Sequence, residues 1–188
     1  MENNELFDTL NDMVVRLNDL GVEYMVTGSV AMSSYVPARS TMDIDVIIEI
    51  EGSDVERFEQ RFAGDYYVSL NSIRQARERN SMFNVMNFAT GIKIDFITKK
   101  PNAFEEGKFE RRRRSRIGEI EFWVISKEDL ILSKLWWAKD SHSERQFEDV
   151  GRLIESGADA VMISNEIAAQ GLDAVWEAYV EWKTRAMK

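Results

Sequence analysis

The spacing of apolar residues changes along the chain and predicts helices, strands and a helical end. Residues 3–20 carry leucine, valine and methionine at helical spacing, so we expect an amphipathic helix that ends at Gly21. A short strand at 22–26 and a helix of small residues that stops near Pro37 should follow. The consecutive apolar residues within 43–50 indicate a strand buried on both faces, central in its sheet.

The second half of the pattern predicts hairpins and then helices. The expected elements are a helix at 54–63, a strand at 66–70, a hairpin within 81–97 turning at Thr90-Gly91, a second hairpin turning at Gly118, and helices from Ser126 onward broken near 140–143, Gly157 and Gly171. Ser126 and Asp129 have the spacing of a capping box. We therefore predict an α+β fold, a mixed β-sheet with flanking helices in 1–125, followed by a C-terminal helical region in 126–188 packed on that core.

Composition narrows the class of protein. The chain has 188 residues, 44% of them hydrophobic, which is enough for a sizeable core. It has no cysteine and one histidine, so thiolate chemistry and His-rich metal sites are excluded. The start of the chain lacks the features of a signal peptide, and no window approaches a membrane span, so we expect a cytoplasmic protein with no membrane partner.

Charge is distributed unevenly. The formal net charge of −9 argues against broad attraction to nucleic acid. The segment KFERRRRSR at 108–116 nevertheless concentrates cations. Arginines of this kind on an edge strand discourage aggregation, and a contact with RNA is the alternative.

Three aspartates stand within apolar strands. Asp43 and Asp45 flank Ile44, so their side chains should project together from one face of the strand. Asp95 lies between apolar neighbours on a strand that could adjoin the first. Clustered carboxylates need a cation between them, and Mg²⁺ prefers such ligands. The alternatives are ordinary acids solvated at the strand end and, for Asp95, an ion pair with Lys93 or an arginine. Three acids on adjacent strands could hold two metal ions about 3.5 to 4 Å apart, as in nucleotidyl transfer.

A Gly-Ser turn lies fifteen residues before the first aspartate. Gly28 would let a ligand approach the backbone, and the Ser29 hydroxyl with nearby backbone N–H groups would suit a triphosphate. An ordinary strand-to-helix turn is the alternative.

Together these residues resemble a known superfamily. The Gly-Ser turn, Arg39-Ser40-Thr41-x-Asp43-Ile44-Asp45 and the later Ile94-Asp95-Phe96 are similar to the nucleotidyltransferase superfamily related to DNA polymerase beta. The Arg-x-Thr-x-Asp-Ile-Asp form and the stretch EDLILSKL further resemble the AbiEii-type branch, which includes toxins of toxin-antitoxin systems, and its uncharacterised relatives.

The resemblance implies a role for each matched residue. Asp43, Asp45 and Asp95 would bind two Mg²⁺ ions, with Mn²⁺ as an alternative, and Asp95 would help to activate an attacking hydroxyl. Gly28 and Ser29 would hold the phosphates of a nucleoside triphosphate (NTP). Lys134 would neutralise phosphate charge, or else be a lysine at the edge of the core. Arg39 and Thr41 would serve the nucleotide, or else fix the loop before the strand.

The implied function is transfer of a nucleoside monophosphate from an NTP to an acceptor hydroxyl. The acceptor stays open between RNA, a protein and a small molecule. A cognate antitoxin or operon partner is expected if the toxin-like resemblance holds. The alternative is a non-catalytic nucleotide-binding or regulatory module with the same fold.

Overall fold

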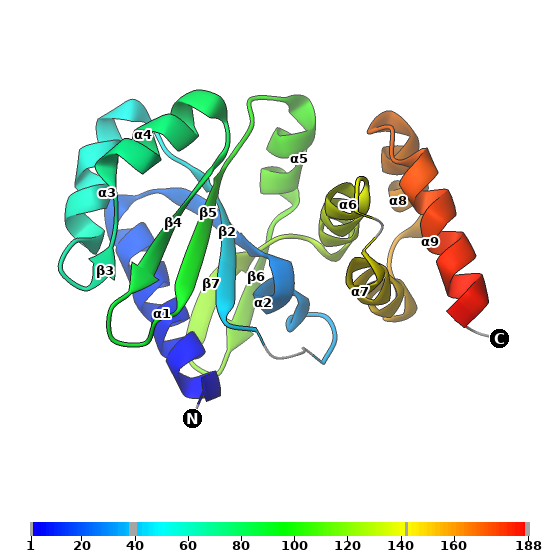
Figure 1. Ribbon diagram of the computed structural model, residues 1–188, viewed down its shortest axis with the longest axis horizontal. Helices are drawn as coiled ribbons and strands as arrows, with labels where there is room; N and C mark the ends of the chain where they lie inside the picture. Colours follow the sequence, from blue (N-terminus) through cyan, green and yellow to red (C-terminus); the bar gives the residue numbers. More distant parts are fainter. Residues whose placement is uncertain (1, 38–40, 142, 187–188) are drawn as a thin grey trace. The chain divides into compact units, whose positions relative to one another are not determined.

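The chain forms two compact units in the computed structural model, which describes residues 2–37, 41–141 and 143–186 (Figure 1). The first unit comprises Met1–Ser34 with Ala38–Ile125, and the second comprises Tyr35–Pro37 with Ser126–Lys188. Every strand of the described residues lies in the first unit, whereas the second is built from helices. No helix among the described residues is long and apolar enough to cross a membrane.

One seven-stranded mixed sheet organises the first unit. Its strands are β1 (Glu23–Thr27), β2 (Asp43–Glu49), β3 (Tyr66–Tyr67), β4 (Met82–Asn87), β5 (Lys93–Thr98), β6 (Arg113–Ile117) and β7 (Ile120–Val124). They are ordered β3-β4-β5-β2-β1-β7-β6. The pairs β2/β5 and β1/β7 are parallel and the other pairs are antiparallel. This confirms the predicted mixed sheet and the central place of β2, whose apolar run needs cover on both sides.

The two predicted hairpins are present. Strands β4 and β5 form the first, and the backbone N–H of Asn87 donates to the carbonyl of Ile92 across its turn. Strands β6 and β7 form the second, and Gly118 turns the chain with a φ of +59°. The second part of the arginine-rich segment supplies β6, which is an edge strand as the sequence analysis considered, whereas its first residues, up to Arg111, lie in a helix.

Helices cover one face of the sheet. They are α1 (Glu2–Leu20), α3 (Val55–Phe62) and α4 (Leu70–Arg79), and α3 follows a short 3-10 turn at Gly52–Asp54. Phe58 of α3 packs edge-on against Phe96 of β5 and Phe83 of β4, with ring centroids 5.2 and 5.5 Å apart. Ile44, whose side chain is fully buried, belongs to this core, and the two aspartates beside it point to the opposite face of the sheet.

Two helices of the structure were not predicted from the sequence. Helix α4 begins where a strand was expected to end, so the predicted strand at 66–70 shrinks to the two residues of β3. Helix α5 (Ala103–Arg111) precedes the arginine-rich strand. Each helix buries only two side chains, so neither carries a clear apolar stripe. Their N-caps, Ser69 and Asn102, accept backbone N–H bonds and were the available signal.

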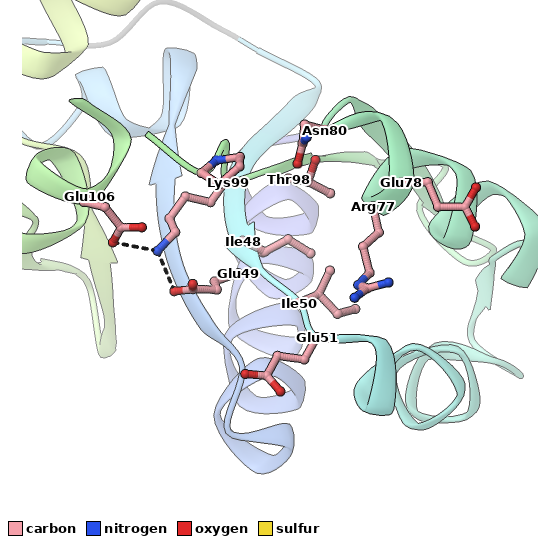
Figure 2. Close-up of a pocket in the computed structure, with 11 residues that line it drawn as sticks. Ile48, Glu49, Ile50, Glu51, Arg77, Glu78, Asn80, Thr98, Lys99 and Glu106 are labelled. Carbon is pink, nitrogen blue, oxygen red and sulfur yellow. Dashed lines mark hydrogen bonds and ion pairs between the residues drawn. The ribbon is translucent and has the colours of Figure 1, made fainter. Parts of the chain in front are cut away.

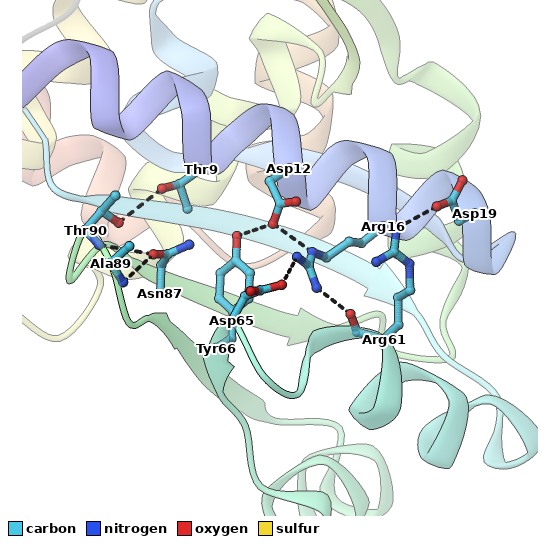
Figure 3. Close-up of polar contacts among 10 residues, drawn as sticks. All are labelled: Thr9, Asp12, Arg16, Asp19, Arg61, Asp65, Tyr66, Asn87, Ala89 and Thr90. Carbon is cyan, nitrogen blue, oxygen red and sulfur yellow. Dashed lines mark hydrogen bonds and ion pairs between the residues drawn. The ribbon is translucent and has the colours of Figure 1, made fainter.

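A buried arginine ties α1 to the chain around β3 (Figure 3). The Arg16 guanidinium donates to Asp12 at 2.7 Å, to Asp65 at 2.6 Å and to the carbonyl of Arg61. The Tyr66 hydroxyl also donates to Asp12, and its burial, with that hydrogen bond, raises the pKa of Tyr66. Arg16 therefore joins α1 to the segment 61–65, which is far from α1 in sequence.

Removing this arginine should destabilise the fold. We expect Arg16→Met to lower the free energy of unfolding by about 2–4 kcal/mol, because Asp12 and the Arg61 carbonyl lose a buried partner. Arg61→Met is the control, because the Arg61–Asp19 pair is more exposed and should contribute less than about 1 kcal/mol. Urea denaturation measures both values, and equal losses would contradict a special role for Arg16.

Four helices form the second unit, as far as its described residues show. They are α6 (Lys127–Ala138), α7 (Glu144–Glu155), α8 (Ala160–Ala169) and α9 (Asp173–Ala186), with breaks where the sequence predicted them. The Ser126 hydroxyl accepts the backbone N–H of Asp129 at 3.1 Å and donates to its carboxylate at 2.6 Å, so the predicted cap is confirmed.

Candidate active site

The register of β2 and β5 brings the predicted acids together. The two strands lie side by side and run parallel (Figure 1). Asp45 lies opposite Asp95, and Asp43 lies opposite Lys93. Asp43 and Lys93 are the first residues of their strands, so the cluster lies at the amino-terminal ends of β2 and β5. The expectation that the two acidic strands adjoin is confirmed.

A polar row extends from these acids across four strands. Thr27 of β1 pairs with Asp45, Asp45 with Asp95, and Asp95 with Asn84 of β4. Paired residues in a sheet point to the same face, so a hydroxyl, two carboxylates and an amide stand side by side. Such a row supplies oxygen ligands and hydrogen-bond groups without any apolar side chain between them.

Gly28 gives the Asp45 carboxylate its space. Gly28 follows β1 with a φ of +62°, a conformation that favours glycine. A Cβ atom at this position would lie 1.9 Å from Asp45 Oδ2. Glycine is therefore required at this position both by the turn and by the nearby Asp45 carboxylate. The second requirement was not predicted from the sequence.

Lys93 places a cation beside two of the acids. Its Nζ lies 2.8 Å from Asp95 Oδ2 and 3.8 Å from Asp43 Oδ1. The pKa of Lys93 is raised, mainly by its hydrogen bond to Asp95. Partial burial lowers the pKa, whereas the negative charges of Asp95, Asp43 and Asp45 raise it further. The alternative pairing of Asp95 with Lys93 is thus present in the structure.

Within the part of the chain that the structure describes, one carboxylate oxygen of the cluster is buried without a partner. Asp95 is 7% exposed, and its Oδ1 is buried without a hydrogen-bond partner among the described residues. A buried carboxylate oxygen left in this way suits a hard cation. As placed, no three Asp, Glu, His or Cys side chains of the described chain form a metal-binding group. The predicted metal ligands therefore stay a prediction, with Lys93 holding two of the acids.

The predicted nucleotide residues occupy different places. Ser29 follows Gly28 in α2 (Gly28–Met32), is half-buried, and makes no hydrogen bond through its hydroxyl within the described part of the chain. Thr41 Oγ1 lies 3.3 and 3.4 Å from the backbone oxygen and nitrogen of Asp43, so it helps to fix the loop before β2. Arg39 lies outside the described residues.

Lys134 belongs to the second unit. It is buried on α6, and its Nζ donates to Asp149 of α7 at 2.6 Å and to Gln146 at 3.4 Å. This contact matches the alternative of a lysine at the edge of a core. The predicted role of Lys134 at a phosphate stays a prediction.

A separate hollow of about 410 Å³ lies at the other ends of β2 and β5 (Figure 2). Its lysine, Lys99, is held by Glu49 at 2.8 Å and Glu106 at 3.0 Å. The lining contains four glutamates against Lys99 and Arg77, so its formal charge is negative. None of the residues that the sequence analysis proposed for a nucleotide or a metal lines this hollow, so the acid row is the better candidate for the active site.

Two polar residues of the site were given no functional role from the sequence: Lys93 was considered only as an ion-pair partner of Asp95, and Asn84 was not considered. Lys93 lies two residues before Asp95 and thus on the same strand face, which was a usable signal. Asn84 carries no such signal, because its place beside Asp95 depends on the register of the β4/β5 hairpin.

Several solved structures have a fold similar to that of this chain. The antibiotic-resistance factor ANT(2'')-Ia matches 100% of this chain over 95% of its own, with a TM-score of 0.56 and 12% sequence identity. The chain has a nucleotidyltransferase fold. ANT(2'')-Ia in complex with adenylyl-2''-tobramycin matches 97% of the chain over 99% of its own, with a TM-score of 0.54 and 11% identity.

A further match shares the nucleotidyltransferase fold. A putative nucleotidyltransferase from Thermotoga maritima matches 77% of this chain over 92% of its own, with a TM-score of 0.54 and 16% identity. No protein-family profile and no curated protein matches the sequence. At these identities the matches confirm the fold that the superfamily resemblance implied, and they do not single out the AbiEii-type branch.

Proposed function

We propose that this protein is a Mg²⁺-dependent nucleotidyltransferase that moves a nucleoside monophosphate from an NTP to an acceptor hydroxyl. The observation that carries the proposal is the pairing of Asp45 with Asp95 on parallel strands, with Gly28 directly against Asp45. In the nucleotidyltransferase fold, acids at this position meet the chemical need of the reaction, because a polyphosphate must be bound and its charge balanced.

Each residue of the cluster has a task in this proposal. Asp43, Asp45 and Asp95 would hold the metal, whose chemistry is to neutralise phosphate charge and polarise the phosphoryl oxygens. Asp95 would also accept the proton of the acceptor hydroxyl, the role that the superfamily resemblance implies. Gly28 and Ser29 would contact the phosphates through the backbone and the Ser29 hydroxyl.

In the proposed transfer, one bond to the α-phosphorus forms as another breaks. The acceptor oxygen forms a bond to the α-phosphorus, and the bond from that phosphorus to the bridging oxygen breaks. Pyrophosphate leaves with the electron pair, while the hydroxyl proton passes to the Asp95 carboxylate. The sheet fixes the acids in place before the substrate arrives, which is the usual source of rate in such reactions.

The acceptor is an RNA end, a protein hydroxyl or a small molecule. ANT(2'')-Ia, with its adenylyl-tobramycin complex, supports a small molecule, and the arginines of β6 support RNA. If the AbiEii-type resemblance holds, the protein is the toxin of a toxin-antitoxin pair and has a cognate partner.

One observation favours a second candidate, a nucleotide-binding or regulatory module without transferase activity. Lys93 already neutralises part of the negative charge of the acid cluster. A protein that used the fold only for binding would keep these ion pairs throughout.

Thermal unfolding with each of the four NTPs and Mg²⁺ tests the nucleotide site. A nucleotide at about 100 times its dissociation constant adds about 2.7 kcal/mol, and we expect it to raise the unfolding midpoint by roughly 5–10 °C. Asp43→Asn is the control variant, and the rise should disappear in it because a metal ligand is lost. A midpoint that no NTP moves would contradict the transferase proposal and leave the regulatory module in first place.

A further inference from the structure

The Lys93 side chain bridges acids on two neighbouring strands. It begins β5, lies opposite Asp43 of β2, and shares a strand face with Asp95. The ammonium hydrogen bonds to one oxygen of Asp95 at 2.8 Å and approaches Asp43 at 3.8 Å. The Lys93 side chain is 40% exposed, so it has room to move, whereas that of Asp95 is only 10% exposed.

One ammonium balances only part of the charge. Asp43 and Asp95 carry two negative charges when ionised, and the single positive charge of Lys93 balances only one of them. A divalent cation that binds these carboxylates competes with Lys93 for Asp95 and Asp43, and it also repels the ammonium. The two cations therefore exclude one another from the same oxygens.

The displaced lysine would have a new partner close by. The lysine side chain is a flexible four-carbon stem that ends in a compact charge. From the first residue of β5 it can leave Asp95 and still reach an anion bound over the acid row. The phosphates of a metal-bound nucleotide bring such an anion to the site, where the carboxylates alone would repel it.

We propose that Lys93 exchanges partners, being the counter-ion of Asp95 and Asp43 in the free protein and a phosphate ligand of the nucleotide once a divalent cation occupies the carboxylates. The inference rests on the proposed function and adds a residue to it. In the bound state the Lys93 ammonium stabilises the negative charge that develops on the departing pyrophosphate.

Opposite effects on two affinities test the exchange. In Lys93→Met the competitor for the carboxylates is lost, so we expect Mn²⁺ alone, titrated by electron paramagnetic resonance, to bind about tenfold more tightly. The same variant should bind a non-hydrolysable NTP analogue with Mn²⁺ about tenfold more weakly in calorimetry, because a charged phosphate contact is lost. Lys93→Arg should restore the analogue affinity to within about threefold of the wild type.

A matched lysine separates this role from a structural one. Lys99 also bridges two carboxylates, but at the other ends of the strands. Lys99→Met should leave both affinities unchanged. Weaker Mn²⁺ binding by Lys93→Met, or unchanged analogue binding, would overturn the exchange while the nucleotidyltransferase proposal stands. A wild type that binds neither Mn²⁺ nor the analogue would overturn both.

Discussion

Asp45→Asn should reduce nucleotidyl transfer by at least about 10³-fold, because it removes a metal ligand worth several kcal/mol in the transition state. Asparagine has nearly the same shape as aspartate, so the contact with Gly28 and the strand pairing should remain. The measurement follows label from the α-phosphate of each NTP into total RNA, into protein and into a panel of aminoglycosides and lincosamides. The same assay identifies the acceptor.

Glu49→Gln is the matched control for this variant. Glu49 ends the same strand and lies on the same face as Asp45, but at the end away from the acid row. Its loss should change transfer by less than about twofold, because it touches no substrate in the proposed mechanism. If Asp45→Asn keeps wild-type transfer, the acid row is not the active site and the fold serves a different purpose here.

Local sequence patterns were sufficient to predict the central strand of the sheet and the two hairpin turns. The apolar run after Asp45 predicted a strand buried on both faces, and β2 is the fourth of seven strands. The glycines at the two hairpin turns marked the chain reversals. Helices α4 and α5 were missed because few of their residues face the core, so their apolar spacing is too weak to stand out from polar loops.

The site was predictable only in part, for a physical reason. Asp43 and Asp45 share a strand face by local geometry, so their pairing follows from the sequence. Their approach to Asp95, Lys93 and Asn84 depends on strand order and register, which non-local packing decides. The ion pair of Lys93 with Asp95 was weighed as an alternative, and the structure shows it beside the features that suit a metal.

Gly28→Ala should abolish transfer although it adds a single methyl group far smaller than any substrate. The new Cβ would overlap Asp45 Oδ2, so either the turn or the carboxylate must move. The left-handed backbone adds a penalty of about 1–2 kcal/mol to the folded state. We expect at least about a 100-fold loss of transfer, because a displacement near 1 Å at a catalytic group has this scale of effect. Urea denaturation and the label-transfer assay measure the two effects separately.

Gly21→Ala isolates the backbone penalty from the clash. Gly21 also has a positive φ, +69°, but a Cβ there would meet nothing within 4 Å. Both variants should lose about 1–2 kcal/mol from the strained backbone, with a further loss in Gly28→Ala from the clash. Only Gly28→Ala should lose transfer and Mn²⁺ binding. Equal behaviour of the two variants would mean that Gly28 serves only to turn the chain; a selective loss at Gly28 would show that this glycine is required because the Asp45 carboxylate must lie against it.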